Sequence, residues 1–480
     1  MTLASPRTRL GVSVGLIGWL ACVEFTSGVL QGYYVPLISD IVKHLGIHDA
    51  DYNWFDAAQL LLSALVVPPL AKLGDMFGHK RILLVSTLLT AAATWWLALA
   101  GSFPSYLAAF ALQGFYVVWL PLEVALIFER GRRSGSAVGT TRRAAGLLVV
   151  ALEAGAIIGA VLSGILFTSF GSLPATLVVP AVCVTLVFFA ILFGVPESEP
   201  LPGRRLDGRG FLVLTFALLL MMGGLTLMRQ AGPGSPWVWL LIVLGLAALV
   251  PFGMIELRSD DPAIDLRVMR RPEMWPVITT AGLIGISLLG AQAPLSTFAG
   301  TSRANGYGLG LDASARSILI GAYLLSLIVG AVLLPLVSRW TTPRWALIGA
   351  STLVGLGYLL FLPLHGSTPQ VLVNMLIAGV GSGALVAALP AAAAAAAPRG
   401  QTGVATGMTN TTKTIGGSIA AAAFGVVLLT GASGAAGAAT GTAASLSGYL
   451  AVWAICGGGA VASVILLFFV PRQAFADSPA

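Results

Sequence analysis

Long apolar segments joined by short loops constrain this chain more than any other feature, because the loops sort by charge. About fourteen such segments lie between Leu10 and Val470, each close to the ~20 residues that cross a lipid bilayer. Nearly all of the 26 Lys and Arg residues fall in alternate loops or in the two tails. The exceptions are Lys43, Arg229, Arg303 and Arg316 on the opposite side, and Lys413 within a segment. Since basic loops remain in the cytoplasm, the pattern predicts a multi-pass protein of the cell (plasma) membrane with cytoplasmic N- and C-termini.

The composition leaves room for little besides these segments. Hydrophobic residues make up 57% of the chain and charged residues 9%, against about 25% charged residues in a soluble domain. The net charge of +7 is explained by cytoplasmic loops that face the anionic lipid bilayer, so it does not argue for nucleic acid. Cys22, Cys183 and Cys456 all lie in apolar segments, which predicts free thiols and no disulfide framework.

The segments predict an all-α membrane protein of about 14 transmembrane helices, with two six-helix halves around a central cavity plus two extra, peripheral helices. Two longer polar linkers, residues 196–205 and 256–271, separate the halves from the extra pair. We therefore expect an N-terminal half over residues 1–200, the extra helices over 201–272 and a C-terminal half over 273–480. The expected spans are residues 10–38, 54–74, 80–100, 104–128, 145–169, 172–194, 209–228, 235–257, 275–298, 312–337, 344–362, 369–395, 402–430 and 447–470.

A motif occupies the loop between the second and third expected spans. It resembles the loop signature of the major facilitator superfamily in the run Leu73-Gly-Asp75-x-x-Gly78-x-Lys80-Arg81, with Ala71 in place of the usual first Gly. The resemblance implies a two-half transporter in which Asp75, Gly78, Lys80 and Arg81 form a latch between helices that breaks during transport. The alternative is a basic loop that only sets topology.

Further segments resemble patterns of the same superfamily, and one of them resembles its fourteen-span drug:proton antiporters. Residues 112–121 look like the fourth-helix pattern that ends in Pro, with Phe110 where a basic residue is expected. The run Gly155-x-x-x-Gly159-Ala-x-x-Ser-Gly164 is similar to the antiporter signature, with Ala for Pro and Ser for Gly. The run from Asn410 to Gly417 looks like the fourteen-span drug:proton antiporters. Small residues at such spacings let helices pack closely, so Gly155, Gly159 and Gly164 serve either packing or the direction of transport.

Three carboxylates lie within expected spans, namely Glu24, Glu123 and Glu153. A carboxylate at the centre of a membrane helix costs roughly 2.5–3.5 kcal/mol even on insertion scales, so it is a functional candidate. Burial favours the protonated form, which suits a group that takes up and releases protons. We therefore predict that these residues couple transport to protons, the alternative for each being a structural hydrogen bond. Lys413 is either a counter-charge in the other half or a side chain that reaches the membrane surface.

Polar and aromatic side chains share helix faces with two of these carboxylates. Helical spacing places Ser27, Gln31 and Tyr34 beside Glu24. The same spacing places Gln113 and Tyr116 beside Glu123, and Trp119 follows one turn after Tyr116. Aromatic rings bind apolar groups and cations. We expect these six uncharged residues to contact a small apolar or cationic substrate.

The leading functional hypothesis is a proton-coupled secondary active transporter that exports drugs or metabolites by alternating access. A proton-coupled importer is the main rival, and a membrane-embedded enzyme or receptor lacks any catalytic or signalling constellation. The sequence contains no phosphate-binding Gly-x4-Gly-Lys-Ser/Thr loop, so we expect the proton gradient to supply the energy. We expect no enzyme activity, no cofactor, no metal site and a monomer.

Overall fold

Helices form all of the regular secondary structure in the described part of the chain. The computed structural model describes residues 6–133, 137–198, 208–232, 234–259, 262, 266–396, 402–430 and 443–470, and no strand occurs among them. Inside a bilayer every backbone N–H and C=O must be satisfied within the protein, which helices achieve.

The expected spans all coincide with helices, but a count of fourteen membrane spans is not confirmed. Within the described residues, 12 helical segments are long and apolar enough to cross a membrane. The helix α1 (Pro6–Tyr33) is not among them, and the first nine of its side chains lie outside the described part of the protein. The helix α15 (Pro343–Leu360) has a shorter apolar stretch, Arg344–Leu360.

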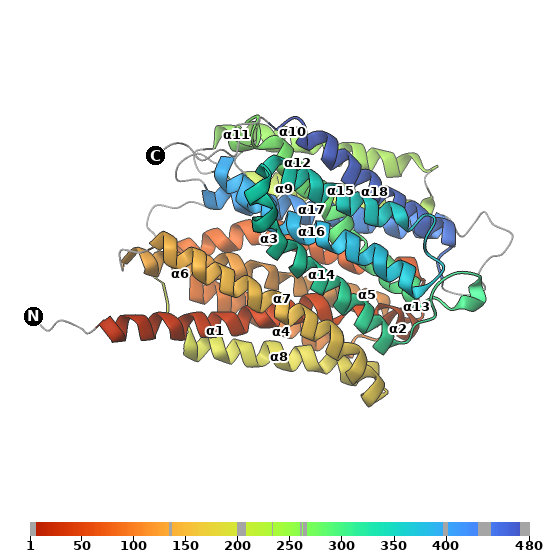
Figure 1. Ribbon diagram of the computed structural model, residues 1–480, viewed down its shortest axis with the longest axis horizontal. Helices are drawn as coiled ribbons and strands as arrows, with labels where there is room; N and C mark the ends of the chain where they lie inside the picture. Colours follow the sequence, from red (N-terminus) through yellow and green to blue (C-terminus); the bar gives the residue numbers. More distant parts are fainter. Residues whose placement is uncertain are drawn as a thin grey trace, which may run out of the picture. The chain divides into compact units, whose positions relative to one another are not determined.

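The chain divides into two compact units, of which unit 1 comprises Met1–Tyr34 and Val66–Leu206. Within unit 1, α1 lies along α7 and α8, α4 lies along α8, and α6 packs on α7 (Figure 1). Besides α1, its elements are the second part of α3 (Tyr52–Phe77), α4 (His79–Leu99), α5 (Phe103–Gln113), the 3₁₀ turn η3 (Gly114–Val118), α6 (Trp119–Arg133), α7 (Ala137–Phe170) and α8 (Leu173–Gly194).

Unit 2 comprises Val35–Leu65 and Asp207–Ala480. It includes the two extra helices, α9 and α10, which pack on each other, while α9 also contacts α17. Besides the first part of α3 and α15, its elements are η1 (Val35–Leu37), α2 (Ile38–Leu45), η2 (Asp49–Asp51), α9 (Gly208–Ala231), α10 (Pro236–Arg258), α11 (Leu266–Met269), α12 (Trp275–Gly285), the π-helical turn η4 (Ile286–Gly290), α13 (Gln292–Gly300), η5 (Arg303–Asn305), α14 (Ala313–Trp340), α16 (Thr368–Ala396), α17 (Thr402–Thr430) and α18 (Leu446–Leu467).

A buried ion pair holds the segment that follows α1 within unit 2. Arg316, at the start of α14, is 2% exposed, pairs with Asp40 of α2 and donates through Nε to the Pro36 carbonyl at 2.9 Å. Ser418 of α17 donates to the carbonyl of Ala57 at 2.8 Å. These bonds join residues that the sequence places in the first two spans to helices of the last six.

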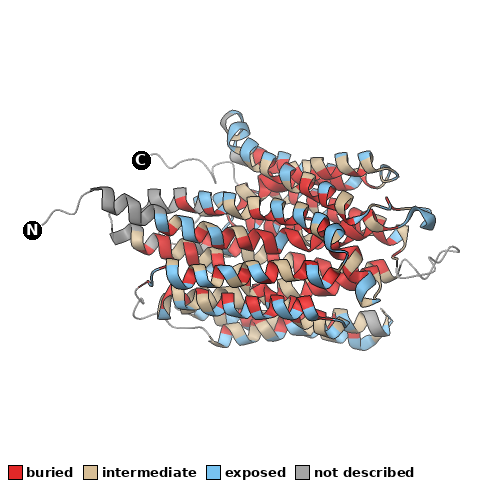
Figure 2. Cartoon of the chain, turned by 90° about the horizontal axis from the view of Figure 1, so that it is seen from below, coloured by how far each residue is buried: buried red, intermediate tan, exposed pale blue. Residues whose placement is uncertain are grey.

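Most helices have one buried face and one exposed face (Figure 2). The exposed faces carry large apolar side chains, such as Trp237 and Val250 on α10. Only 17% of the most apolar 18-residue stretch of α10 is buried, whereas the corresponding fraction in the segment Trp275–Gly300 is 67%. Extended apolar surfaces of this kind are typical of contact with lipid.

Candidate functional site

Two of the predicted carboxylates lie together in unit 1. Glu24 of α1 and Glu123 of α6 are both 0% exposed, and their charges interact. Among the described residues, neither carboxyl group has a hydrogen-bond partner for either of its oxygens. Moving an unpaired carboxylate out of water costs several kcal/mol. The arrangement therefore strongly disfavours two simultaneous negative charges.

The third predicted carboxylate, Glu153, differs from Glu24 and Glu123 in its surroundings. It lies on α7 and is partly exposed, and it has at least one polar or electrostatic partner. Its proposed proton-coupling role therefore lacks the burial and the unpaired oxygens that distinguish Glu24 and Glu123.

A buried hydrogen-bond network includes two of the predicted substrate residues. Nε2 of Gln113, at the end of α5, donates to the Tyr34 hydroxyl at 2.8 Å and to the Thr94 hydroxyl at 3.1 Å. The Tyr34 ring also contacts Phe110 edge-to-face at 5.7 Å between centroids. Of the other residues predicted on the α1 face, Ser27 is buried and Gln31 is exposed.

The fourth expected span is not one continuous α-helix. It breaks into the 3₁₀ turn η3 directly after Gln113, and α6 then begins at Trp119. Pro121 falls in the first turn of α6, where a missing N–H breaks no helical bond. Tyr116 of η3 and Trp119 form an edge-to-face pair with centroids 6.1 Å apart. A 3₁₀ stretch within a longer helix often marks a functional hinge, and Glu123 lies just after this one.

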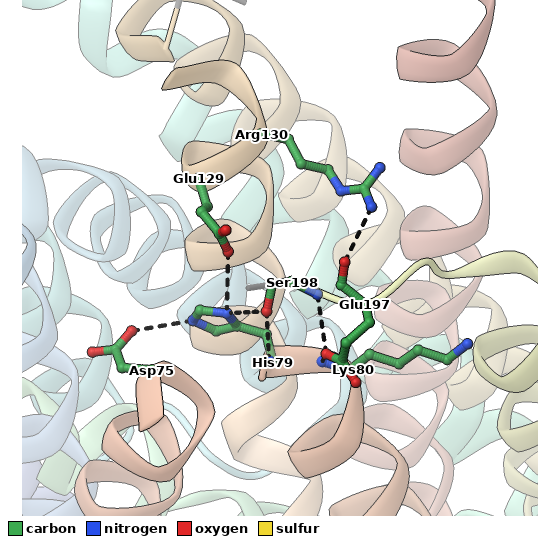
Figure 3. A network of polar contacts seen from close by, with 7 residues as sticks. All are labelled: Asp75, His79, Lys80, Glu129, Arg130, Glu197 and Ser198. Carbon is green, nitrogen blue, oxygen red and sulfur yellow. Dashed lines mark hydrogen bonds and ion pairs between the residues drawn. The ribbon is translucent and has the colours of Figure 1, made fainter. Parts of the chain in front are cut away.

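The loop motif forms a polar cluster whose centre differs from the prediction (Figure 3). Asp75 approaches His79, with Nε2 of the ring 3.2 Å from Oδ1. The other ring nitrogen lies 2.8 Å from the Ser198 hydroxyl and 3.9 Å from Oε2 of Glu129. His79 is 3% exposed. In this structure Asp75 therefore contacts His79, which occupies the variable position of the motif between Gly78 and Lys80.

The predicted pairing of Asp75 with Lys80 and Arg81 is not the one that the structure shows. Lys80 donates through Nζ to the carbonyl of Leu192 at 2.8 Å, and Arg81 pairs with Glu197 at 3.5 Å. The reason is helical geometry, because α4 begins at His79 and the next two side chains point about 100° and 200° further round the axis.

Gly78 connects the two helices of the motif. Its φ of +103° is unfavourable for a residue with a side chain, and a Cβ there would lie 2.6 Å from Oε1 of Glu197. The turn therefore requires glycine for its backbone conformation, and the Glu197 carboxylate lies where a side chain would begin. No sequence pattern singled out His79, Glu129, Glu197, Ser198 or Thr94 as site residues. A Thr87–Thr90–Thr94 repeat on one face of α4 was the available signal for the last of these.

Unit 2 contains a small cavity beside Lys413. Thr409, Asn410 and Lys413 of α17 line it together with apolar residues of α12 and α16, and its volume is about 30 Å³, close to that of one water molecule. Lys413 has a polar or electrostatic partner. No group of three or more His, Cys, Asp or Glu side chains in the described residues could hold a metal ion.

Known proteins share both the sequence pattern and the fold. The chain is 24% identical over 445 residues to the "Probable actinorhodin transporter" of Streptomyces coelicolor, covering 88% of this chain and 73% of that protein. It is 28% identical over 428 residues to the puromycin resistance protein of Streptomyces alboniger, covering 83% and 78%.

Solved structures show the same fold at low sequence identity. An auto-inhibited peptide transporter of the POT family superposes with a TM-score of 0.69 at 16% identity, covering 98% of this chain and 99% of that one. The nucleoside transporter NupG superposes with a TM-score of 0.64 at 14% identity, covering 97% and 100%. The profile of the Major Facilitator Superfamily matches residues 20–421. The chain therefore belongs to the major facilitator superfamily of multi-pass membrane transporters of small molecules, and it is not an enzyme.

Proposed function

We propose that this protein exports small apolar or cationic compounds from the cytoplasm in exchange for protons, by alternating access. The observation that carries the proposal is the buried pair of Glu24 and Glu123, whose four oxygens have no hydrogen-bond partner in the described chain. Ionisable groups in this position within transporters mark proton and substrate pathways.

The chemistry follows from the cost of burying charge. While α1 and α6 pack as they do here, Glu24 and Glu123 are stable with at least one proton between them. Opening of the site to water or arrival of a cationic substrate stabilises the ionised form and releases the proton. Substrate and proton then compete for the same carboxyl groups, which is the requirement for exchange. Gln113, Tyr34, Tyr116 and Trp119 supply aromatic and hydrogen-bonding groups for the substrate along the same part of the chain.

Relatives support export over import. Proteins similar to this chain include an actinorhodin transporter, a puromycin resistance protein, a cephamycin export protein and multidrug resistance proteins. Inverted membrane vesicles separate the two directions, with puromycin as the first probe. An exporter accumulates the probe only when the vesicle interior is acidic, whereas a proton-coupled importer accumulates it under the opposite gradient.

Glutamine variants test the role of the carboxyl pair. Glu24→Gln and Glu123→Gln keep the shape of the side chain and remove its titration. We expect each to reduce proton-driven accumulation about tenfold or more, while binding of the probe loses its dependence on pH. Glu153→Gln is the comparison, because that residue is partly exposed. If Glu24→Gln and Glu123→Gln both transport uphill at the wild-type level while Glu153→Gln does not, the proton-coupling residue is Glu153 on α7.

We propose further that α1 and α15 cross the membrane as well, which makes fourteen spans with both termini in the cytoplasm. Residues 10–33 of α1 form a largely apolar stretch that contains a single charged residue, Glu24. In this scheme the protein alternates between two conformations, and the Asp75 cluster stabilises one of them. The protein works as a monomer in this scheme. Labelling of cysteines placed in alternate loops tests the topology.

A further inference from the structure

An open groove lies within unit 2, where α10 ends and α12 begins. Its volume is about 610 Å³, and ligand pockets in proteins have volumes of about 300–1,000 Å³. α10 contributes apolar side chains and Gly253, α11 contributes Leu266 and Met269, and the segment that follows contributes Arg270 and Trp275. The groove is thus large enough for a ligand, and a single short stretch of the chain forms it.

The position of α11 beside α10 creates the groove (Figure 1). The last carbonyls of a helix have no partner within it. Here Nη2 of Arg267 donates to the carbonyl of Leu257 at 2.7 Å and to that of Ser259 at 3.2 Å, which holds α11 at the end of α10. A Cβ at Gly253 would lie 3.5 Å from Cδ1 of Leu266. The missing side chain at Gly253 therefore leaves space between the two helices.

The body of the groove is apolar and open to the surroundings of the protein. Apart from Arg270 and the indole N–H of Trp275, the groups that line it are hydrocarbon or thioether side chains and one glycine. Val250 is 63% exposed, Met254 51% and Trp275 38%. Covering apolar surface of this kind stabilises a complex by roughly 25 cal/mol per Å². The body of the groove therefore favours a hydrocarbon chain as its occupant.

One end of the groove is cationic. Arg270 lines it and is exposed, and the next residue, Arg271, is exposed as well. Glu273, the acidic side chain that follows, is half-buried and does not line the groove. A guanidinium group matches the geometry of a phosphate and binds it through two parallel hydrogen bonds. This end therefore favours a phosphate group.

The predicted topology places both ends of the groove at suitable depths. Trp residues concentrate at the level of the lipid headgroups, and Trp275 lies five positions after Arg270. The loop charges predict that this end of α10 lies on the cytoplasmic side, where anionic lipids collect. An apolar trough that ends at an arginine matches an amphiphile with an acyl chain and an anionic headgroup.

We propose that this groove binds one anionic phospholipid of the membrane, with an acyl chain along α10 and the phosphate on Arg270. Arg267 is a positioning residue, because it holds α11 in place and its bonds go to the end of α10. The bound lipid links α10, α11 and the start of α12. The site is a property of the protein without substrate, and it does not depend on the direction of transport or on proton coupling.

Native mass spectrometry of the purified full-length protein measures the binding directly. Phosphatidylglycerol and phosphatidylcholine serve as the two probes, each titrated separately. We expect the wild type to retain one phosphatidylglycerol more tightly than phosphatidylcholine. Arg270→Gln should bind phosphatidylglycerol about tenfold more weakly, because the phosphate loses a charged hydrogen-bond donor. Arg258→Gln is the matched control, since Arg258 is exposed at the end of α10 and does not line the groove.

A second pair of variants tests the apolar part without changing any charge. Gly253→Leu fills the groove and should also weaken binding of phosphatidylglycerol. Gly223→Leu on α9 is its control, because nothing lies within 4 Å of an added Cβ there. Binding is compared with the melting temperature of each variant, so that a loss caused by unfolding is recognised.

Three results would overturn the proposal. Equal losses in Arg270→Gln and Arg258→Gln would indicate a general attraction between charges and no defined site. Wild-type binding in Gly253→Leu would place the lipid elsewhere on the protein. Displacement of the phospholipid by puromycin would assign the groove to a transported compound. Because no transport is measured, failure here leaves proton-coupled export standing, and loss of export in the Glu24 variant leaves the lipid site standing.

Discussion

Replacing Gly155 by Ala is expected to force α1 and α7 apart. A Cβ at Gly155 would lie 1.9 Å from the carbonyl oxygen of Phe25 and 2.8 Å from its carbonyl carbon. Ordinary contact begins at 3.4 Å, so the two helices must separate locally by about 1.5 Å. The obstacle is backbone, which cannot rotate away as a side chain can. Since Phe25 follows Glu24, the same displacement disturbs the carboxyl pair.

The cost follows from two opposing effects. Inserting a methyl group into a tightly packed contact costs typically ~1–3 kcal/mol, and a rigid backbone contact belongs in the upper part of that range. Ala gains up to ~1 kcal/mol over Gly in helix propensity. We therefore expect Gly155→Ala to lower the free energy of unfolding by ~1–2 kcal/mol.

Two glycines on the same helix provide controls. Gly146 has nothing within 4 Å of its added Cβ, and the Cβ at Gly159 would lie 3.0 Å from Cα of Val29. Apparent melting temperatures of the purified variants in one detergent should therefore fall in the order Gly146→Ala, Gly159→Ala, Gly155→Ala. Equal melting temperatures for Gly155→Ala and Gly146→Ala would refute the close-packing argument.

Three other substitutions give direct tests of the structure. Asp75→Asn should slow turnover with little loss of substrate affinity, since the cluster biases conformations without touching substrate. Initial transport rates and substrate binding are measured separately, and an unchanged transport rate would contradict this prediction. Arg316→Ala should destabilise the protein by ~3–5 kcal/mol by leaving Asp40 without its buried partner, and a thermal shift no larger than that of a surface Arg variant would contradict this. Gln113→Leu should weaken substrate binding by ~1 kcal/mol or more, as the Tyr34 hydroxyl loses its donor; unchanged binding would place the substrate away from this network.

Sequence patterns predict the helices and individual polar residues within them, but not the partners of those residues. Glu24 and Glu123 were both predicted from their position in apolar segments, yet nothing in their spacing shows that α1 and α6 bring them together. Asp75 was identified from the loop motif, but its neighbour proved to be His79. In a loop, a residue's direction depends on where the next helix begins, and here Gly78 and the start of α4 at His79 decide it.

The amino-acid sequence alone determined the class of protein, the placement of its helices and its family. These follow from local properties, because a bilayer requires ~20 apolar residues per span. It also excludes any backbone whose N–H and C=O groups are not hydrogen-bonded within the protein. Only the tertiary structure assigned Val35–Leu65 to unit 2 through Arg316 and Asp40, and only it placed Ser198 against His79. Residues 276 and 119 positions apart in the chain form these contacts. Long-range pairing depends on how whole helices pack, and no periodicity within a single helix encodes it.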